Sequence, residues 1–454
     1  MQVSSYYISP NKYLMIDKPH FCTIPWVHLH NWPDGRVFTC RTSLREYHNL
    51  GNLYNSSIEE IWNGEELTQL RKDMIDGVPR PDVCDRCYQN DKLGITSLRK
   101  YANERFYDEF LEQSKHEVVP AKLYYWDFRF DNTCSQACRT CGPALSSSWV
   151  EDSFKITGKR PPGTKPFVKL NKDNINTKII QEQLPNVKEI NFAGGEPILT
   201  QDHYYILNEL ITRDRAKEVS FTYVTSLTTL KYKDMNMLDV WPKFKDVSIG
   251  ISLDDIGERA EYWRHGTKWD KFFSNLKSVR ELSTNHPNIK LNFFITVSVF
   301  NVNQISKIIK FLQDNNLLDE TNIIYTYSVL GYVEFLEITT LPEDYKKDVI
   351  KQLHEANRLL GDHPSKTNID ALILKLAQPI TDYGQDLKCM ASMFKEDFSS
   401  EVSPEGHRKK AAKHFAMLDK IRNESLKHIA PELYDIYKDY GYEEEYQKFV
   451  PFTL

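Results

Sequence analysis

Six short strand-like runs alternate with amphipathic helix-like runs between about residues 122 and 330, and this alternation limits the possible folds most strongly. The predicted strands are 123–130, 188–193, 218–225, 246–253, 289–299 and 322–329. Strand–helix alternation is typical of parallel α/β proteins. Because a full eight-fold barrel takes roughly 250 residues, this shorter stretch predicts a partial (β/α)6 TIM-like barrel.

The predicted strands carry polar residues on one face and apolar residues on the other. In the first strand Asp127 and Arg129 alternate with Trp126, Phe128 and Phe130. The apolar face of such a strand packs against the surrounding helices, so the polar face points into the barrel. The pattern therefore predicts an internal cavity for a polar substrate, with Asp127 and Arg129 as substrate contacts. Polar residues at strand ends are the alternative explanation.

Composition and cysteine placement indicate the wider organisation. The 454 residues include 58 basic and 63 acidic ones, and this balance argues against a dominant nucleic-acid-binding surface. The N-terminus has no apolar signal-like run, and no stretch approaches the roughly 18 apolar residues of a membrane span. We therefore expect a cytoplasmic protein with reduced cysteines and no membrane partner. The predicted parts are an N-terminal module (1–92), a helical linker (93–120), the barrel (121–335) and a mostly helical C-terminal region (336–454).

Three cysteines follow the first predicted strand with the spacing Cys134-x3-Cys138-x2-Cys141. Three thiolates on one loop can ligate three irons of a [4Fe-4S] cluster and leave the fourth iron open. An electron-transfer site would supply four cysteines, so an open iron indicates a catalytic site. A zinc site that takes its fourth ligand from elsewhere, or three unrelated cysteines, are the alternatives.

A second group of cysteines lies in the N-terminal module. A PDG turn before Cys40 predicts a β-hairpin that carries this residue, Cys22 precedes the hairpin, and Cys84 and Cys87 form a Cys-x2-Cys pair. Four thiolates in two pairs can bind one zinc ion or a fully ligated iron–sulfur cluster. Spacing alone does not choose between them. Cys389 stands alone, and a buried free thiol is the commoner role for such a residue.

Together these motifs resemble the radical S-adenosylmethionine (SAM) superfamily. The resemblance rests on the three-cysteine motif and on FAGGEPIL at the end of the second predicted strand, and the GPALSSS that follows the cysteines resembles the SPASM/twitch branch. It covers about residues 20–330. It implies that SAM chelates the open iron of a [4Fe-4S] cluster. Reductive cleavage of SAM would then give a 5′-deoxyadenosyl radical that abstracts hydrogen from the substrate.

The resemblance also implies roles for individual residues. The GGEP segment would hold the amino group of SAM. The serine of ISLDD and the arginine of YWRHGT would hold its carboxylate, and a valine on the fifth strand would pack against its adenine. These residues are Gly194, Gly195, Glu196, Pro197, Ser252, Arg264 and Val297. Glycines permit close backbone approach, and an arginine fork suits a carboxylate. A plain position on the barrel wall is the alternative for the last three.

In the N-terminal module the series DG.V..C, GNL, EIWNGE and C..C resembles the auxiliary-cluster modules of this branch. The resemblance favours a second [4Fe-4S] cluster on Cys22, Cys40, Cys84 and Cys87, with zinc as the alternative. In the best-known members this module follows the barrel, whereas here it precedes it.

The family implies a reductant such as flavodoxin or ferredoxin. The first expectation for the substrate is a peptide or protein side chain, and the second is a small polar metabolite. A rival hypothesis from another functional class is a non-catalytic metal-binding protein that binds a ligand or a partner.

Overall fold

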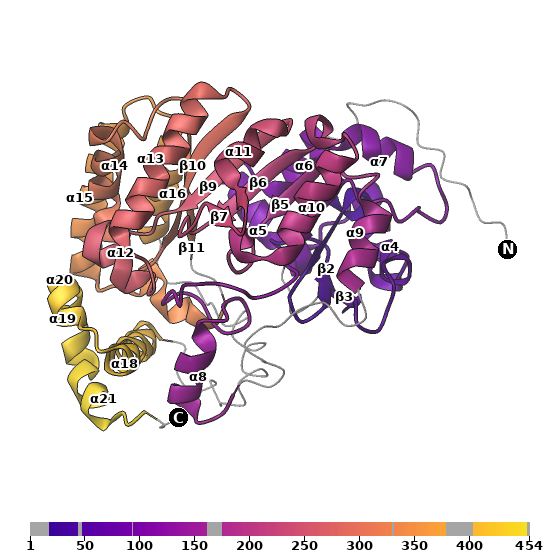
Figure 1. Cartoon of the computed structure of the whole chain (residues 1–454). Helices are drawn as coiled ribbons and strands as arrows, with labels where there is room; N and C mark the ends of the chain where they lie inside the picture. Colours follow the sequence, from indigo (N-terminus) through magenta and orange to yellow (C-terminus); the bar gives the residue numbers. More distant parts are fainter. Residues whose placement is uncertain are drawn as a thin grey trace. The chain divides into compact units, whose positions relative to one another are not determined.

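The computed structural model describes residues 18–43, 48–92, 94–160, 175–328, 331–377 and 403–451 (Figure 1). The chain divides into two compact units, each built from several segments. The first unit is made of Met1–Asn132, Val168–Tyr223 and Val240–Val247, and the second of Thr133–Phe167, Val224–Asp239 and Ser248–Leu454. Cys389 lies outside the described residues. No helix within the described ranges is long and apolar enough to cross a membrane.

A mostly parallel sheet in the order β6-β5-β4-β1-β2-β3 forms the centre of the first unit. Strand β4 pairs in parallel with β5, and β5 pairs in parallel with β6. Strand β1 comes from the N-terminal module and pairs in parallel with β4, with His28 opposite Tyr125. The strands are β1 (His28–Asn31), β2 (Arg36–Phe38), β3 (Asn49–Asn52), β4 (Tyr125–Phe128), β5 (Glu189–Phe192) and β6 (Ser220–Thr225). The N-terminal strands therefore extend the same sheet.

The antiparallel pairing of β1 with β2 confirms the hairpin predicted before Cys40. Its turn needs Gly35, which adopts a φ of 85° that other residues rarely take. Helix α3 begins with a capping box, in which the Ser57 hydroxyl accepts from the Glu60 amide and the Glu60 carboxylate accepts from the Ser57 amide. The helices of this unit are α2 (Ile24–Val27), α3 (Ile58–Trp62), α4 (Glu65–Asp76), α5 (Pro81–Lys92), α6 (Leu98–Arg105), α7 (Tyr107–Gln113), α9 (Ile175–Gln183) and α10 (Gln201–Thr212).

The second unit contains parallel strands covered by helices, followed by the C-terminal helices. Strand β10 pairs in parallel with β11, helix α15 packs against α14 and α16, and α18 packs against α8 and α21 (Figure 1). The strands are β9 (Asp246–Ser252), β10 (Ile289–Val297) and β11 (Ile324–Ser328), together with a separate antiparallel pair, β7 (Lys231–Tyr232) and β8 (Met235–Asn236). The helices are α8 (Trp149–Thr157), α11 (Met237–Val240), α12 (Gly257–Trp263), α13 (Trp269–Asn285), α14 (Ile305–Asp314), α15 (Glu343–Leu360), α16 (Lys366–Ala377), α18 (Pro404–Arg422), α19 (Leu426–Ile429), α20 (Pro431–Tyr437) and α21 (Tyr442–Lys448).

All six predicted strands are present as β4, β5, β6, β9, β10 and β11, and each of these six lies inside its predicted range. The predicted two-sided character is present in β9, where Val247, Ile249 and Ile251 are fully buried whereas Ser248 and Ser252 are half-buried. It is absent from β4, where both faces are buried and Asp127 is as inaccessible as Trp126. Parallel strands that alternate with helices confirm the predicted α/β class, and their succession along the chain is that of a partial (β/α)6 barrel.

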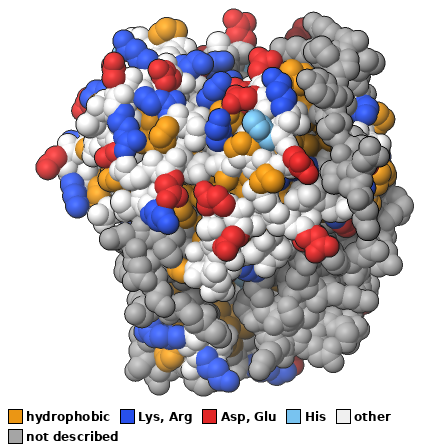
Figure 2. All heavy atoms as spheres, turned by 90° about the vertical axis from the view of Figure 1, so that its right-hand side faces the viewer, with side chains coloured by type: hydrophobic (Ala, Val, Ile, Leu, Met, Phe, Trp, Pro, Cys, Tyr) orange, Lys and Arg blue, Asp and Glu red, His pale blue; other side chains and the backbone are white. Residues whose placement is uncertain are grey.

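The surface shown in Figure 2 carries charges of both signs. Over the described part of this face, basic and acidic side chains are interspersed, with hydrophobic side chains scattered among them. This mixture agrees with the small net charge of −5 for the whole sequence. Interspersed charges of this kind favour solubility and do not build a strong field of one sign.

Candidate functional site

The three-cysteine loop (residues 134–141) follows β4 and has a tightly held backbone. The Ala137 amide donates to the carbonyl of His265 at 2.8 Å, and the Arg139 amide donates to the carbonyl of Trp263 at 2.9 Å. The Trp149 indole Nε1 donates to the carbonyl of Cys138 at 2.8 Å. Backbone amides and carbonyls with fixed partners keep the three thiols on a defined framework.

Three consecutive serines hold the loop from its other side. The Ser146 hydroxyl donates to the Gln136 carbonyl at 2.6 Å, and the hydroxyls of Ser147 and Ser148 donate to the Cys134 carbonyl at 3.2 and 2.8 Å. These are the serines of the GPALSSS segment. Their hydroxyls satisfy backbone groups that a loop without regular pairing would leave open.

The predicted SAM contact Arg264 lies beside the three-cysteine loop. Its Nη2 donates to Gln136 Oε1 at 3.1 Å, and its Nη1 donates to Asp254 Oδ2 at 2.8 Å. Burial alone would lower the pKa of Arg264, but the Cys138 thiol and Asp254 raise it, so the guanidinium stays charged. Burial raises the pKa of the Cys138 thiol, and Arg264 opposes that rise. A permanent cation is therefore held next to the predicted cluster ligands.

Close contact between this arginine segment and the loop requires a glycine. Gly266 has a φ of 98°, and a Cβ placed on it would lie 2.6 Å from the carbonyl oxygen of Ser135 and 3.3 Å from Gln136 Cα. Such distances are too short for a side chain. The glycine in YWRHGT therefore lets the segment that carries Arg264 touch the cysteine loop.

The other two predicted SAM contacts of the second unit lie at strand ends. Ser252 is half-buried at the end of β9, whereas Val297 is fully buried at the end of β10. Sequence reasoning missed Asp254, which accepts from the Thr296 amide at 2.7 Å, and Asn301, whose side-chain amide donates to the Asp254 carbonyl at 2.8 Å. These bonds orient the carboxylate that holds Arg264, and the run LDD after the strand was the available signal.

The GGEP segment lies in the first unit, directly after β5. Gly194 adopts a φ of 124°, and a Cβ on it would contact the Arg129 side chain at 3.4 Å. Glu196 is buried, and its Oε1 accepts from the Ile198 amide at 3.2 Å, which caps a short 3-10 helix that begins at Pro197. The segment thus forms a turn with an unusual backbone, packed against Arg129.

Asp127 is fully buried, and a histidine and two arginines of the same unit lie around its carboxylate. Its Oδ1 lies 3.4 Å from His30 Nδ1 and 3.7 Å from Arg129 Nε, and its Oδ2 lies 3.8 Å from Arg41 Nη1. Burial alone would raise the Asp127 pKa, but His30, Arg129 and Arg41 hold it well below its usual range. The carboxylate is therefore ionised.

Sequence reasoning placed Asp127 and Arg129 on one strand face but missed His30 and Arg41. Both come from the N-terminal module, whose strand β1 pairs with β4. His30 and Arg41 come close to Asp127 only because β1 pairs with β4, a strand distant in the sequence. The alternation of His28, Leu29 and His30 was a weak sign that β1 carries imidazoles on one face.

The four N-terminal cysteines line one cavity in the first unit. The lining comprises Cys22, Cys40, Cys84 and Cys87 together with apolar side chains such as those of Leu70 and Val83. Burial raises the pKa of the Cys22 thiol, and the neighbouring thiols of Cys84, Cys87 and Cys40 raise it further. Sulfur donors in an apolar cavity are the donor type that both zinc and iron–sulfur clusters take. Within the described ranges, however, no three His, Cys, Asp or Glu side chains lie close enough together to hold a single metal ion, so the support for this site is the shared cavity and the donor type.

Two family models match this chain. The SPASM iron–sulfur cluster-binding domain matches residues 22–88, and the radical SAM superfamily matches residues 129–312. No curated protein matches.

Nine chains of solved structures are similar to this chain, including the following two. The structure of TYW1 with a lysine–pyruvate adduct bound shows 15% identity and a TM-score of 0.30, over 53% of this chain and 71% of that chain. The crystal structure of Streptococcus suis SuiB bound to S-adenosylmethionine shows 13% identity and a TM-score of 0.30, over 72% of this chain and 69% of that chain. At these scores neither likeness indicates a substrate.

Proposed function

This chain belongs to the SPASM-containing branch of the radical SAM superfamily and is an iron–sulfur enzyme. From that premise we propose that Cys134, Cys138 and Cys141 ligate the cluster that cleaves SAM. The observation that carries the proposal is the contact between the three-cysteine loop and Arg264 through Gln136. It sets a charged guanidinium, which suits the carboxylate of SAM, beside three sulfur donors. The matched radical SAM domain also favours an enzyme over the rival hypothesis of a non-catalytic metal-binding protein.

The residues of the chain have distinct tasks in this proposal. When bound, the cluster and SAM supply a 5′-deoxyadenosyl radical that abstracts hydrogen from the substrate. Arg264, held by Asp254, binds the carboxylate of SAM, and the half-buried hydroxyl of Ser252 donates to it. The backbone carbonyls of the GGEP turn and the Glu196 carboxylate accept from its ammonium group. Val297 is fully buried at the end of β10, so we treat it as a core residue and not as a contact of the adenine.

Substrate recognition is assigned to Arg129. Its side chain is 12% exposed, whereas Asp127 behind it is fully buried, so Arg129 contacts the substrate and Asp127 orients Arg129. Two arginines around one carboxylate leave an excess of positive charge, which favours a substrate that carries a carboxylate. An acidic side chain or C-terminus of a peptide fits this requirement, and the acid group of a small metabolite is the second candidate.

We assign an auxiliary [4Fe-4S] cluster to Cys22, Cys40, Cys84 and Cys87. The match of this segment to an iron–sulfur cluster-binding domain supports a cluster over zinc. Four thiolates complete the ligation of a cubane cluster, so this site has no open iron for a substrate. A reductant such as flavodoxin or ferredoxin would supply the electrons.

Anaerobic reconstitution tests the proposal. Two cubane clusters require roughly eight irons per chain, and the reduced protein should convert SAM to 5′-deoxyadenosine. Iron and zinc are measured by elemental analysis and the nucleoside by chromatography. Zinc at both sites, or two clusters without any SAM cleavage, would contradict the proposal.

A further inference from the structure

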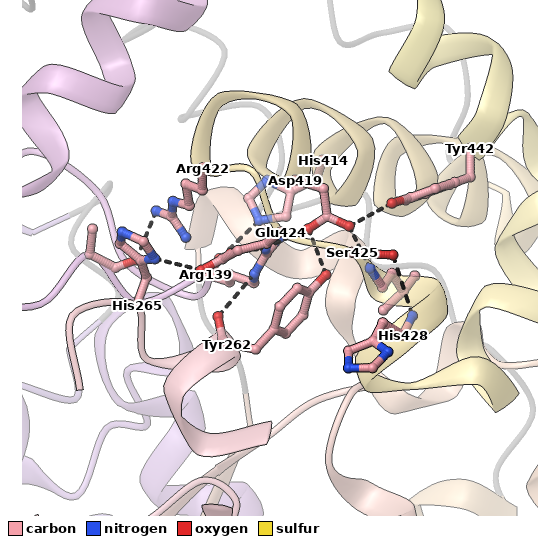
Figure 3. Close-up of polar contacts among 12 residues, drawn as sticks. Arg139, Tyr262, His265, His414, Asp419, Arg422, Glu424, Ser425, His428 and Tyr442 are labelled. Carbon is pink, nitrogen blue, oxygen red and sulfur yellow. Dashed lines mark hydrogen bonds and ion pairs between the residues drawn. The ribbon is translucent and has the colours of Figure 1, made fainter. Parts of the chain in front are cut away.

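Arg139 lies inside the three-cysteine motif, and its side chain binds residues of helix α18 and of the turn that follows it. The guanidinium is fully buried, and its Nη2 lies 2.5 Å from both Asp419 Oδ1 and Glu424 Oε2 (Figure 3). Its Nε donates to the carbonyl of Tyr262 at 3.1 Å, and its Cζ lies 3.7 Å from the centre of the Tyr262 ring. A buried cation with two carboxylates fixes the position of the backbone that carries it.

Helix α18 also binds the loop backbone directly. Arg422 Nη2 donates to the Ala137 carbonyl at 2.8 Å and to Asp152 Oδ2 at 2.7 Å. His414 Nε2 lies 2.9 Å from the Arg139 carbonyl oxygen. Two loop carbonyls beside Cys138 are thus bonded to side chains of one distant helix.

The acidic partners are themselves fixed by further hydrogen bonds. Asp419 accepts from the hydroxyl of Tyr262 at 2.8 Å, the hydroxyl of Tyr442 at 2.5 Å and the Leu426 amide at 2.7 Å (Figure 3). Glu424 Oε1 lies 2.6 Å from His265 Nδ1. Such a connected network allows few alternative geometries.

Apolar packing joins the same elements. Ala137, Trp149 and Leu418 form a buried cluster, and Cys141 and Ile421 pack against it. Cys141 therefore packs against a cluster that includes Leu418 of helix α18. This apolar contact joins the three-cysteine loop to the same helix without any charged group.

We propose that helix α18 and the turn after it position the three-cysteine loop, so that the C-terminal region is a structural part of the SAM-cleaving site. The positioning residues are His414, Asp419, Arg422 and Glu424. The role of the loop as a cluster site rests on the function proposed above. The positioning itself is a property of the loop and can be measured without iron.

The first experiment compares cysteine alkylation in the iron-free, reduced full-length chain. Asp419→Asn removes the charge that faces Arg139, so local opening should raise the labelling rate of buried Cys138 by about tenfold and those of half-buried Cys134 and Cys141 by less. The auxiliary cysteines serve as an internal reference, and their rates should stay within about twofold. Mass spectrometry of the digested protein resolves each position.

Matched variants separate local positioning from general stability. Glu424→Gln is a milder change in the same network, because this side chain is 19% exposed, and it should raise the same three rates. Glu405→Gln lies on the same helix, where Glu405 forms an exposed pair with Lys409, and it should change none. Equal acceleration of both cysteine groups, or no acceleration in either network variant, would overturn the proposal.

Iron uptake provides the second readout. After reconstitution, Asp419→Asn should hold about four irons where the wild type holds about eight, with the loss at the three-cysteine site. If the wild type takes up iron but does not cleave SAM, the proposed function fails while the labelling result still decides the positioning. If Asp419→Asn and Glu424→Gln both show the cysteine labelling rates and the iron content of the wild type, the proposed positioning role is wrong while the proposed function stands.

Discussion

Arg139 and Asp419 are 280 positions apart in the sequence and form a fully buried ion pair, with 2.5 Å between Nη2 and Oδ1. The loss of solvation on burial offsets much of the attraction in such a pair, so its net contribution to stability is small. Removing only one of the two charged side chains lowers stability strongly, because the other charge then stays buried without that partner. The main effect of the pair is therefore to fix the position of the loop beside Cys138, and its net contribution to the stability of the fold is small.

Asp419→Ala should lower the free energy of unfolding by about 3–5 kcal/mol, because Arg139 loses a buried counter-charge. Urea denaturation followed by circular dichroism measures the change. Adding Arg139→Met should restore part of the loss, since the buried cation that keeps only Glu424 as its counter-charge is then gone. A double variant as unstable as the sum of both single variants would contradict this account.

Gly266→Ala should displace the three-cysteine loop, because the new Cβ would lie 2.6 Å from the Ser135 carbonyl oxygen. We expect a loss of about 1–3 kcal/mol in stability together with loss of iron from the three-cysteine site. Gly257→Ala is the control, because Gly257 also has a positive φ but has open space around its Cβ position. Similar iron loss in both variants would show that backbone strain, and not the contact with Ser135, is responsible.

The two groups of cysteines should respond differently to substitution. Cys134→Ala removes a proposed ligand of the SAM-cleaving cluster and should abolish the formation of 5′-deoxyadenosine. Cys84→Ala affects the auxiliary site, so some uncoupled SAM cleavage should remain while substrate turnover is lost. Chromatography of the nucleoside products measures both. Equal loss of cleavage in the two variants would argue against separate roles.

Arg129→Gln should reduce substrate turnover at least tenfold and leave uncoupled SAM cleavage within about threefold, because a single charged contact to a carboxylate contributes about 1.5–3 kcal/mol. Asp127 would remain beside Arg41 and His30, so folding is preserved. The measurement compares KM and kcat for carboxylate-bearing peptides with those for their amides. A variant that keeps the wild-type preference for the acid would rule out Arg129 as the contact.

Local patterns predicted the strands, and the resemblance of YWRHGT to a family segment singled out Arg264, whereas contacts between distant segments could not be predicted. Strand alternation and the PDG turn depend on neighbouring residues, so six strands and one hairpin could be read from the sequence. The pairing of β1 with β4, which brings His30 to Asp127, has no local signature. The C-terminal stretch was predicted as helix, but Asp419 and Arg422 resemble residues of a solvated helix face until Arg139 is placed against them.

Stability should depend on pH through His203, which is buried with its Nε2 2.9 Å from the Tyr223 hydroxyl. Burial lowers the pKa of His203 from 6.5 to about 3. Between these two values the unfolded chain binds a proton that the folded chain excludes, so stability falls as the pH falls, by about 1.4 kcal/mol per pH unit. His203→Gln should remove this part of the slope in urea denaturation series between pH 5 and pH 7. The same substitution at exposed His354 controls for the loss of an imidazole. An unchanged slope in His203→Gln would mean that His203 is protonated in the folded chain.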